Sequence, residues 1–389
     1  MNSMSRVDGM TTVARMYLVA MALFLITIVI GILNGADAVK FNHDQILTHV
    51  HSGTLGWISL ALVAAAMWMF GAVDRRLALT LGILIPIYVA AFYWGNLPAR
   101  AISGTALLVA IAWVVVWVWR AWSVERTLPG LSLALGLTTF GYGALIGVLI
   151  QIERATESQI FNQDAVGGHA SAMVFSYLIL VAMGLIEWRV LGTKGLPKAG
   201  LVQLGALFAG GLLLTVALLF LSAEATQAVG GIYLLVELIA IVLFAVRVVP
   251  TAARGSIGRY LAASTVFVFV AIGIFLYLIS LFISSGDPES VNFNLIKASD
   301  HAAFIGVVTN LVFALILALT AGMADRAPGW VSTLGFWAMN LGLAVFLVGL
   351  GQDLADIKRI GAPVMGVGIL LIMYVLAMRL WRSAGMSRA

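Results

Sequence analysis

The fold of this chain follows from the stretch Thr48-His49-Val50-His51-Ser52-Gly53-Thr54-Leu55-Gly56-Trp57, which opens a long apolar run with two histidines. In an α-helix, residues two positions apart point about 200° away from each other. His49 and His51 therefore cannot serve one site from one face of a helix. The stretch predicts two imidazoles that face different neighbours inside a helical bundle.

The composition around this stretch is that of an integral membrane protein. Of the 389 residues, 62% are hydrophobic and 10% are charged, whereas a soluble protein of this size needs a more polar surface. The chain has no cysteine, which excludes disulfides, thiolate haem ligands, iron–sulfur clusters and thiol nucleophiles. The net charge of +5 is spread over short connections, so it indicates membrane topology and not nucleic-acid binding.

Twelve apolar runs have the length that spans the hydrocarbon core of a bilayer. They lie at roughly 13–33, 49–73, 77–96, 101–122, 129–152, 166–187, 199–222, 228–249, 260–284, 301–323, 333–352 and 361–381. An even number of spans places both termini on one side. Since 16 of the 22 Lys and Arg residues lie on that side, both termini are expected in the cytoplasm of a bacterial cell, with the chain in its inner membrane.

The histidine-bearing spans recur at regular intervals. Spans two, six and ten each follow a long outer connection, at roughly 34–48, 153–165 and 285–300. This recurrence predicts one transmembrane domain, 1–389, built from three pseudo-repeated blocks of four helices at roughly 1–128, 129–259 and 260–389. When the three blocks are aligned, His51, His169 and His301 fall at equivalent positions.

The five histidines suggest a metal cofactor. His49, His51, His169 and His301 are expected at the outer ends of their spans, and His43 in the connection before span two. An ordinary interfacial role is the alternative. A copper or zinc ion needs three or four converging ligands, whereas a haem needs one or two imidazoles and an apolar slot. Haem is therefore expected in preference to a copper or zinc ion.

Three motifs resemble subunit I of the haem–copper oxidase superfamily, which includes the nitric oxide reductases. His49-Val50-His51-Ser52-Gly53-Thr54-Leu55-Gly56-Trp57 is similar to the paired-histidine motif of cbb-type oxidases. His169-Ala170-Ser171-Ala172-Met173-Val174-Phe175 is similar to their second-span motif, and His301-Ala302-Ala303-Phe304-Ile305-Gly306-Val307 to the tenth-span motif of nitric oxide reductases. The resemblance implies that the first histidine of the pair binds a high-spin haem and the second a low-spin haem.

The chain also departs from that family. The paired histidines lie on span two instead of span ten, and Ser299 stands where the family has its high-spin haem ligand. The family binds copper or iron with two histidines of span seven, whereas residues 199–222 contain none. A complete binuclear centre is not expected, nor is the usual reduction of oxygen or nitric oxide.

Two ligand schemes remain open. In the first, His51 and His301 hold a low-spin haem and His169 occupies the vacant metal position. In the second, His51 pairs with His169, His49 carries a second haem, and His301 occupies the vacant position. His51 is a ligand in both schemes.

Other polar residues carry weaker predictions. By the family resemblance, Lys358 and Arg359 bind haem propionates; alternatively, they pair with Asp353 and Asp356. Glu237, deep in span eight, is either a proton-path or quinone-site residue or a structural hydrogen-bonding group. Asn310 and Asn340 are expected to join two helices by hydrogen bonds. Arg247 and Glu187, at inner ends of spans, are expected to snorkel towards water.

These observations predict a haem b-binding membrane protein that serves in electron transfer, gas sensing or as an accessory respiratory subunit. Its expected partners are lipid and either a quinone or a cytochrome or respiratory subunit. One alternative is a haem-free transporter or scaffold that kept the fold. Another is a divergent, haem-dependent oxidoreductase with a five-coordinate haem on His49.

Overall fold

Helices form all the regular secondary structure among the residues that the computed structural model describes, which are 3–161, 165–192, 195–255, 257–285, 292–323 and 328–385, with side chains from Gly9 onwards. Among these residues, 12 helical segments are long and apolar enough to cross a membrane. This number confirms the prediction of twelve spans. The chain divides into two compact units, Met1–Asn96 with Phe304–Ala389 as unit 1 and Leu97–Ala303 as unit 2.

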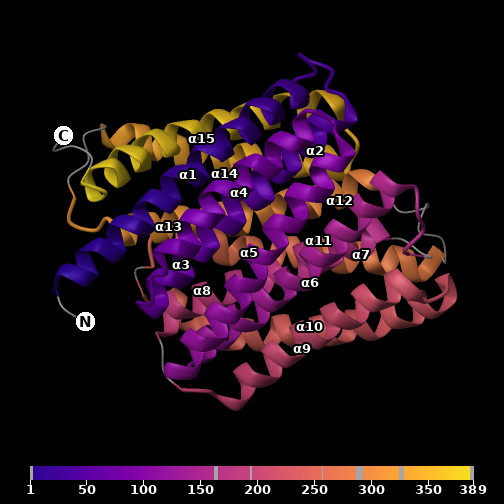
Figure 1. Cartoon of the computed structure of the whole chain (residues 1–389), viewed down its shortest axis with the longest axis horizontal. Helices are drawn as coiled ribbons and strands as arrows, with labels where there is room; N and C mark the ends of the chain where they lie inside the picture. The colour runs from indigo at the N-terminus through magenta and orange to yellow at the C-terminus, as the bar shows by residue number, and fades with distance from the viewer. Residues whose placement is uncertain are drawn as a thin grey trace. The chain divides into compact units, whose positions relative to one another are not determined.

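Unit 1 contains the first three and the last two spans, with most of the tenth. Its elements are α1 (Ser3–Gly35), α2 (His43–His51), η1 (Ser52–Ser59), α3 (Leu60–Phe70), α4 (Arg75–Tyr93), η4 (Ala302–Thr309, from Phe304), α13 (Asn310–Leu319), α14 (Gly329–Gly351) and α15 (Ala355–Ser383). The first and last helices, α1 and α15, lie side by side (Figure 1). Small residues allow this approach, because a Cβ atom on Gly366 would lie 2.4 Å from Ile32 Cγ1.

Unit 2 contains spans four to nine and the start of span ten. Its elements are α5 (Leu97–Val124), α6 (Leu128–Thr156), α7 (Ala165–Ser171), η2 (Ala172–Leu178), α8 (Ile179–Leu191), α9 (Lys198–Phe220), α10 (Ala223–Arg254), α11 (Arg259–Ser285) and α12 (Phe293–His301). The span made of α7, η2 and α8 packs against α6 and α9, and 83% of its most apolar 18-residue stretch is buried. It is therefore the central span of this unit.

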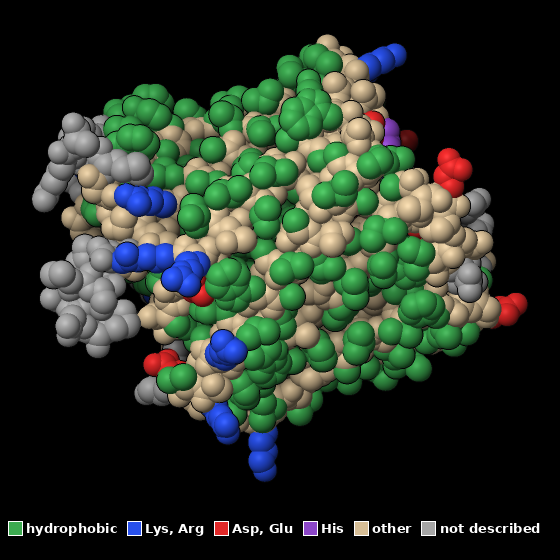
Figure 2. All heavy atoms as spheres, in the orientation of Figure 1, with side chains coloured by type: hydrophobic (Ala, Val, Ile, Leu, Met, Phe, Trp, Pro, Cys, Tyr) green, Lys and Arg blue, Asp and Glu red, His purple; other side chains and the backbone are tan. Residues whose placement is uncertain are grey.

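The outward faces are apolar. Ile102 and Val109 of α5 are 72% and 69% exposed, as a lipid-facing helix requires. On the face drawn in Figure 2, hydrophobic side chains are spread over the whole surface, and Lys and Arg lie mainly towards its left and lower edges. Contact with membrane lipid follows from this surface.

Two histidine-bearing spans begin earlier than the sequence indicated. Asn42 caps α2 through a capping box with Gln45, so His43 is the first helical residue and does not lie in a connection. Asn292 caps α12 without a capping box, and its side chain accepts a hydrogen bond from the backbone N–H of Asn294. His49, His51 and His301 consequently lie inside helices, about two turns from the helix start, and not at the span ends.

A buried ion pair joins α8 and α10 of unit 2. Arg247 donates from Nη1 and Nη2 to the two carboxylate oxygens of Glu187, both at 2.9 Å, and from Nη1 to Gln203 Oε1 at 2.7 Å. Gln203 Nε2 in turn donates to Glu187 at 2.9 Å, and Glu187 is only 1% exposed. The prediction that Arg247 and Glu187 snorkel is therefore wrong, because each satisfies the other inside the bundle.

Candidate functional site

Each histidine-bearing span changes from α-helix to π-helix next to its histidines. η1 begins directly after His51, η4 begins directly after His301, and η2 begins three residues after His169. π-Helical segments are rare and are found preferentially at functional sites. Nothing in the apolar pattern predicted them.

Hydroxyl side chains help to stabilise two of these π-helices. Ser59 Oγ donates to the carbonyl of Thr54 at 2.8 Å, and Thr309 Oγ1 donates to that of Phe304 at 2.9 Å, each five residues back. Five residues is the hydrogen-bond spacing of a π-helix. Within unit 1, Trp57 Nε1 also donates to Thr309 Oγ1 at 3.0 Å, so the two segments share one buried hydrogen bond.

His49 faces α1. Its Nδ1 lies 2.8 Å from the carbonyl oxygen of Thr27, and a Cβ atom on Gly31 would lie 3.0 Å from its Cε1. The carbonyl of Thr27 therefore orients the ring, and Gly31 leaves room for it.

His51 faces α4. Its Nδ1 lies 2.8 Å from the carbonyl oxygen of Leu47, and its ring stacks on Phe92 with centroids 3.8 Å apart and an edge contact to Tyr88. Since His49 contacts α1 and His51 contacts α4, the prediction that the pair faces two different neighbours is confirmed within unit 1.

His169 is held like His49. Its Nδ1 lies 2.8 Å from the carbonyl oxygen of Gly143 on the preceding span, and a Cβ atom on Gly147 would lie 2.8 Å from its Cε1. In both cases a glycine four residues after the accepting carbonyl makes room for the ring.

His301 is held like His51. Its Nδ1 lies 2.7 Å from the carbonyl oxygen of Lys297, four residues back in the same helix. Two residues earlier, Ser299 Oγ donates to the carbonyl of Ala271 on the preceding span at 3.2 Å.

The shared geometry defines two positions before each π-helix. At the first position, three residues before the π-helix, the side chain bonds to the preceding span; this position holds His49, His169 and Ser299. At the second position, directly before the π-helix, lie His51, Ser171 and His301. The sequence comparison set His51, His169 and His301 in register, and that alignment is wrong by two residues at His169. Similar apolar residues follow every histidine, so the sequence alone did not reveal the shift.

The four imidazoles share one electronic feature. A backbone carbonyl only accepts hydrogen bonds, so the Nδ1 that faces it at 2.7–2.8 Å carries the proton in the neutral ring. Nε2 is then the basic nitrogen, and this is the tautomer that metal-ligating histidines usually adopt. Among the described residues, no group of three or more His, Cys, Asp or Glu side chains could hold a metal ion.

No known family model matches the sequence, and no curated protein matches it with significance.

Lys358 and Arg359 are engaged by carboxylates of unit 1. Lys358 Nζ lies 2.9 Å from Asp353 Oδ1, while Arg359 bonds to Asp37 at 2.6 Å and to Asp356 at 3.2 Å. Pairing with Asp353 and Asp356 is the alternative that the sequence offered. A role in binding propionates stays a prediction.

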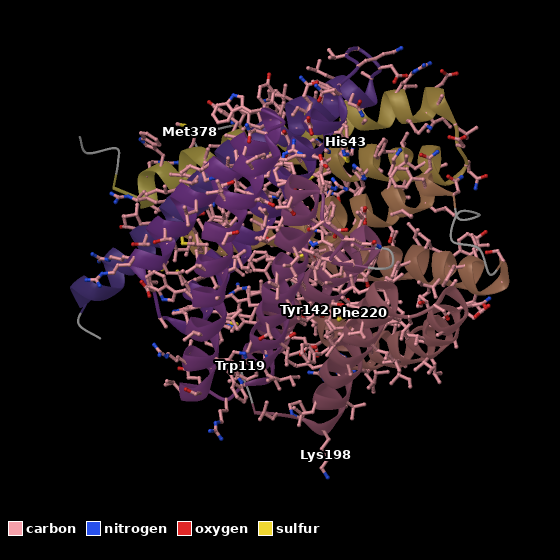
Figure 3. All side chains as sticks on the ribbon, turned by 45° about the vertical axis from the view of Figure 1, so that its right-hand side comes forward. His43, Trp119, Tyr142, Lys198, Phe220 and Met378 are labelled. Atoms are coloured by element: carbon pink, nitrogen blue, oxygen red, sulfur yellow. The ribbon has the colours of Figure 1, made fainter. Side chains whose placement is uncertain are left out.

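Buried polar groups gather in unit 2. Glu237 and Tyr233 of α10 are each 1% exposed, and Tyr142 of α6 lies within the bundle near the Phe220 end of α9 (Figure 3). Asn310 and Asn340, by contrast, belong to unit 1 and satisfy each other, with Asn310 Nδ2 donating to Asn340 Oδ1 at 2.8 Å. This bond joins α13 to α14 and confirms their predicted structural role.

Proposed function

We propose that the chain is a haem b-binding membrane protein related to subunit I of the haem–copper oxidases, and that it serves in electron transfer. The observation that supports the proposal is the hydrogen-bonding pattern that the four imidazoles share. Each has Nδ1 on a backbone carbonyl and therefore Nε2 as the basic nitrogen. A haem held by two such imidazoles would supply one-electron exchange.

The surroundings of the rings fit such a group. Gly31 and Gly147 admit His49 and His169 at close range, and Phe92 fixes the plane of His51. Oriented imidazoles lose little freedom when they bind a metal, because their second nitrogen is already anchored. His51 remains the ligand common to both schemes, with His169 or His301 as its partner, and His49 is the candidate for a second haem.

The architecture proposed for this function is three pseudo-repeated blocks of four helices with both termini in the cytoplasm of a bacterial inner membrane. Its support is the same sequence of α-helix, π-helix and α-helix in spans two, six and ten. The excess of Lys and Arg on the terminal side supports the orientation. A quinone or a cytochrome or respiratory subunit would exchange electrons with the haem.

The test is the absorption spectrum of the purified, full-length protein after expression with sufficient haem. We expect a low-spin, bis-imidazole spectrum in both redox states that carbon monoxide leaves unchanged. His51→Ala should abolish it under either scheme. His43→Ala is the matched control, because His43 begins the same helix, is exposed, and should not bind haem.

Two results would contradict the proposal. A wild-type protein without a Soret band is no haem protein, and a His51→Ala protein that retains the whole spectrum excludes His51 as a ligand. A carbon monoxide adduct that disappears in His49→Ala would instead support the alternative, an oxidoreductase with a five-coordinate haem on His49.

A second candidate function is a haem-free transporter or scaffold that kept the fold. The specific observation in its favour is Glu237, a carboxyl group 1% exposed in the interior of a span. Absence of haem from a folded, monodisperse preparation would favour this function.

A further inference from the structure

Unit 2 contains buried polar atoms that the protein itself does not satisfy. The hydroxyls of Tyr142, Ser176 and Tyr233 and the Oε2 atom of Glu237 are shielded from solvent and have no hydrogen-bond partner among the described residues. Unsatisfied buried polar groups cost free energy, so in a native protein they usually bind internal water or a ligand.

These atoms come from different helices and lie near one another. Tyr233 and Glu237 are one turn apart on the same face of α10 and interact electrostatically, although no hydrogen bond of proper geometry joins them. Tyr233 also interacts with Tyr142 of α6, whose hydroxyl lies near Ser176 of η2 and Thr215 of α9. The atoms thus extend as a chain from Glu237 to the π-helix of the central span.

The threonines beside Tyr142 can accept hydrogen bonds. Thr215 Oγ1 donates its own proton to the carbonyl of Gly211 at 2.8 Å, and Thr139 Oγ1 donates to that of Leu135 at 3.1 Å. Their remaining lone pairs therefore face outward from each helix. Gly211 makes room for Ser176, because a Cβ atom there would lie 1.8 Å from Ser176 Oγ.

In the described part of the chain, no ion pair joins Glu237 to a cation. Phe275 of α11 packs edge-on against Tyr233. Arg247 lies ten residues along α10, about 15 Å away, and is bonded to Glu187. A buried carboxylate without a cation is far costlier than a buried carboxylic acid.

We propose that Glu237, Tyr233, Tyr142 and Ser176 form an internal proton-exchange site, in which Glu237 is a carboxylic acid that exchanges its proton with solvent through hydroxyls and bound water. In each exchange, the acid gives one proton to a neighbouring oxygen and receives one back, so the net charge is unchanged. The site does not depend on haem.

The test is infrared spectroscopy of the full-length protein in lipid nanodiscs. At neutral pH we expect the C=O stretching band of a protonated carboxylic acid, which shifts after transfer to D2O. Glu237→Gln should remove the band. Glu224→Gln is the matched control, because Glu224 is an exposed residue in the first turn of the same helix and its loss should leave the band.

The roles of Tyr142 and Tyr233 are tested by the rate at which the C=O band shifts in D2O. Tyr142→Phe and Tyr233→Phe keep the rings and remove only the hydroxyls, and each should slow the shift about fivefold, the typical effect of one lost hydrogen bond. These variants also test the proposal if Glu237→Gln fails to fold.

Three results would overturn the proposal: no protonated-acid band in the wild type, a band that survives in Glu237→Gln, or a band that never shifts in D2O. Unchanged rates in both tyrosine variants would overturn the assigned path. The band should persist in His51→Ala, so failure of the haem proposal and failure of this one can be told apart.

Discussion

His169 Nδ1 lies 2.8 Å from the carbonyl oxygen of Gly143, and this single contact places His169 at the position of His49 and not at that of His51. The contact requires Gly147 one turn further along α6, since any side chain there would meet the ring. Gly143 and Gly147 thus together fix the imidazole of His169 against a neighbouring span.

Substitution of Gly147 should therefore change the orientation of the His169 ring while leaving residue 169 itself a histidine. In Gly147→Val the first side-chain atom would lie 2.8 Å from His169 Cε1, so the ring must turn away from the Gly143 carbonyl. If His169 is a haem ligand, the variant should lose that haem, as measured by haem content per protein. Gly205→Val is the control, because Gly205 is exposed and a Cβ atom there meets nothing within 4 Å. Equal haem content in both variants would exclude His169.

The two ligand schemes differ in which partner of His51 is essential. His301→Ala should abolish the bis-imidazole spectrum in the first scheme, and His169→Ala should abolish it in the second. Low-temperature electron paramagnetic resonance of the oxidised protein distinguishes loss of one ligand from loss of haem. A spectrum unchanged in both variants would contradict both schemes.

Much of the architecture could be predicted because it depends on hydropathy. Twelve spans follow from run length alone, and the opposite directions of His49 and His51 follow from helix geometry. The hydrogen bond between Asn310 and Asn340 followed from the cost of leaving amides unsatisfied among apolar helices.

The features that were missed depend on contacts between distant residues. The π-helices need both local hydroxyl bonds and close packing, such as that of Gly56 on Leu23, which a pattern of apolar residues does not encode. The early start of α2 did have a local signal, the capping pair Asn42 and Gln45, which the emphasis on hydropathy obscured. The ion pair of Glu187 and Arg247 joins residues 60 positions apart and had no local signal.

The buried ion pair should be important for stability. Arg247→Ala leaves the carboxylate of Glu187 buried without its cation, which typically costs about 3–5 kcal/mol. Thermal unfolding of the purified protein should show this loss, and Arg247→Ala with Glu187→Gln should recover part of it. Arg359→Ala, which breaks the exposed pair with Asp37, should leave the unfolding midpoint unchanged. Similar midpoints for the Arg247 and Arg359 variants would contradict the buried network.

The close approach of α9 to η2 predicts a compensating pair of substitutions. In Gly211→Ala the new methyl group would lie 1.8 Å from Ser176 Oγ and 2.7 Å from its Cβ, so the two segments must separate. Overpacking of this kind typically costs about 1–3 kcal/mol. Adding Ser176→Gly removes both clashing atoms and should restore much of the unfolding midpoint, although Ser176→Gly alone should lower it. A double variant less stable than Gly211→Ala would show that the two residues do not pack as described.

The hydrogen bond between Trp57 and Thr309 should stabilise the π-helices of unit 1. Thr309→Val keeps the shape of the side chain but leaves the buried Trp57 Nε1–H without its acceptor and removes the side-chain hydrogen bond to the carbonyl of Phe304. An unsatisfied buried donor costs about 1–3 kcal/mol, which a lower unfolding midpoint and altered tryptophan fluorescence would reveal. Thr333→Val is the control, since Thr333 also bonds to a carbonyl in its own helix but is exposed. If the two variants unfold alike, the bond does not contribute to stability, and close packing of η1 on α1 must suffice to hold the π-helix.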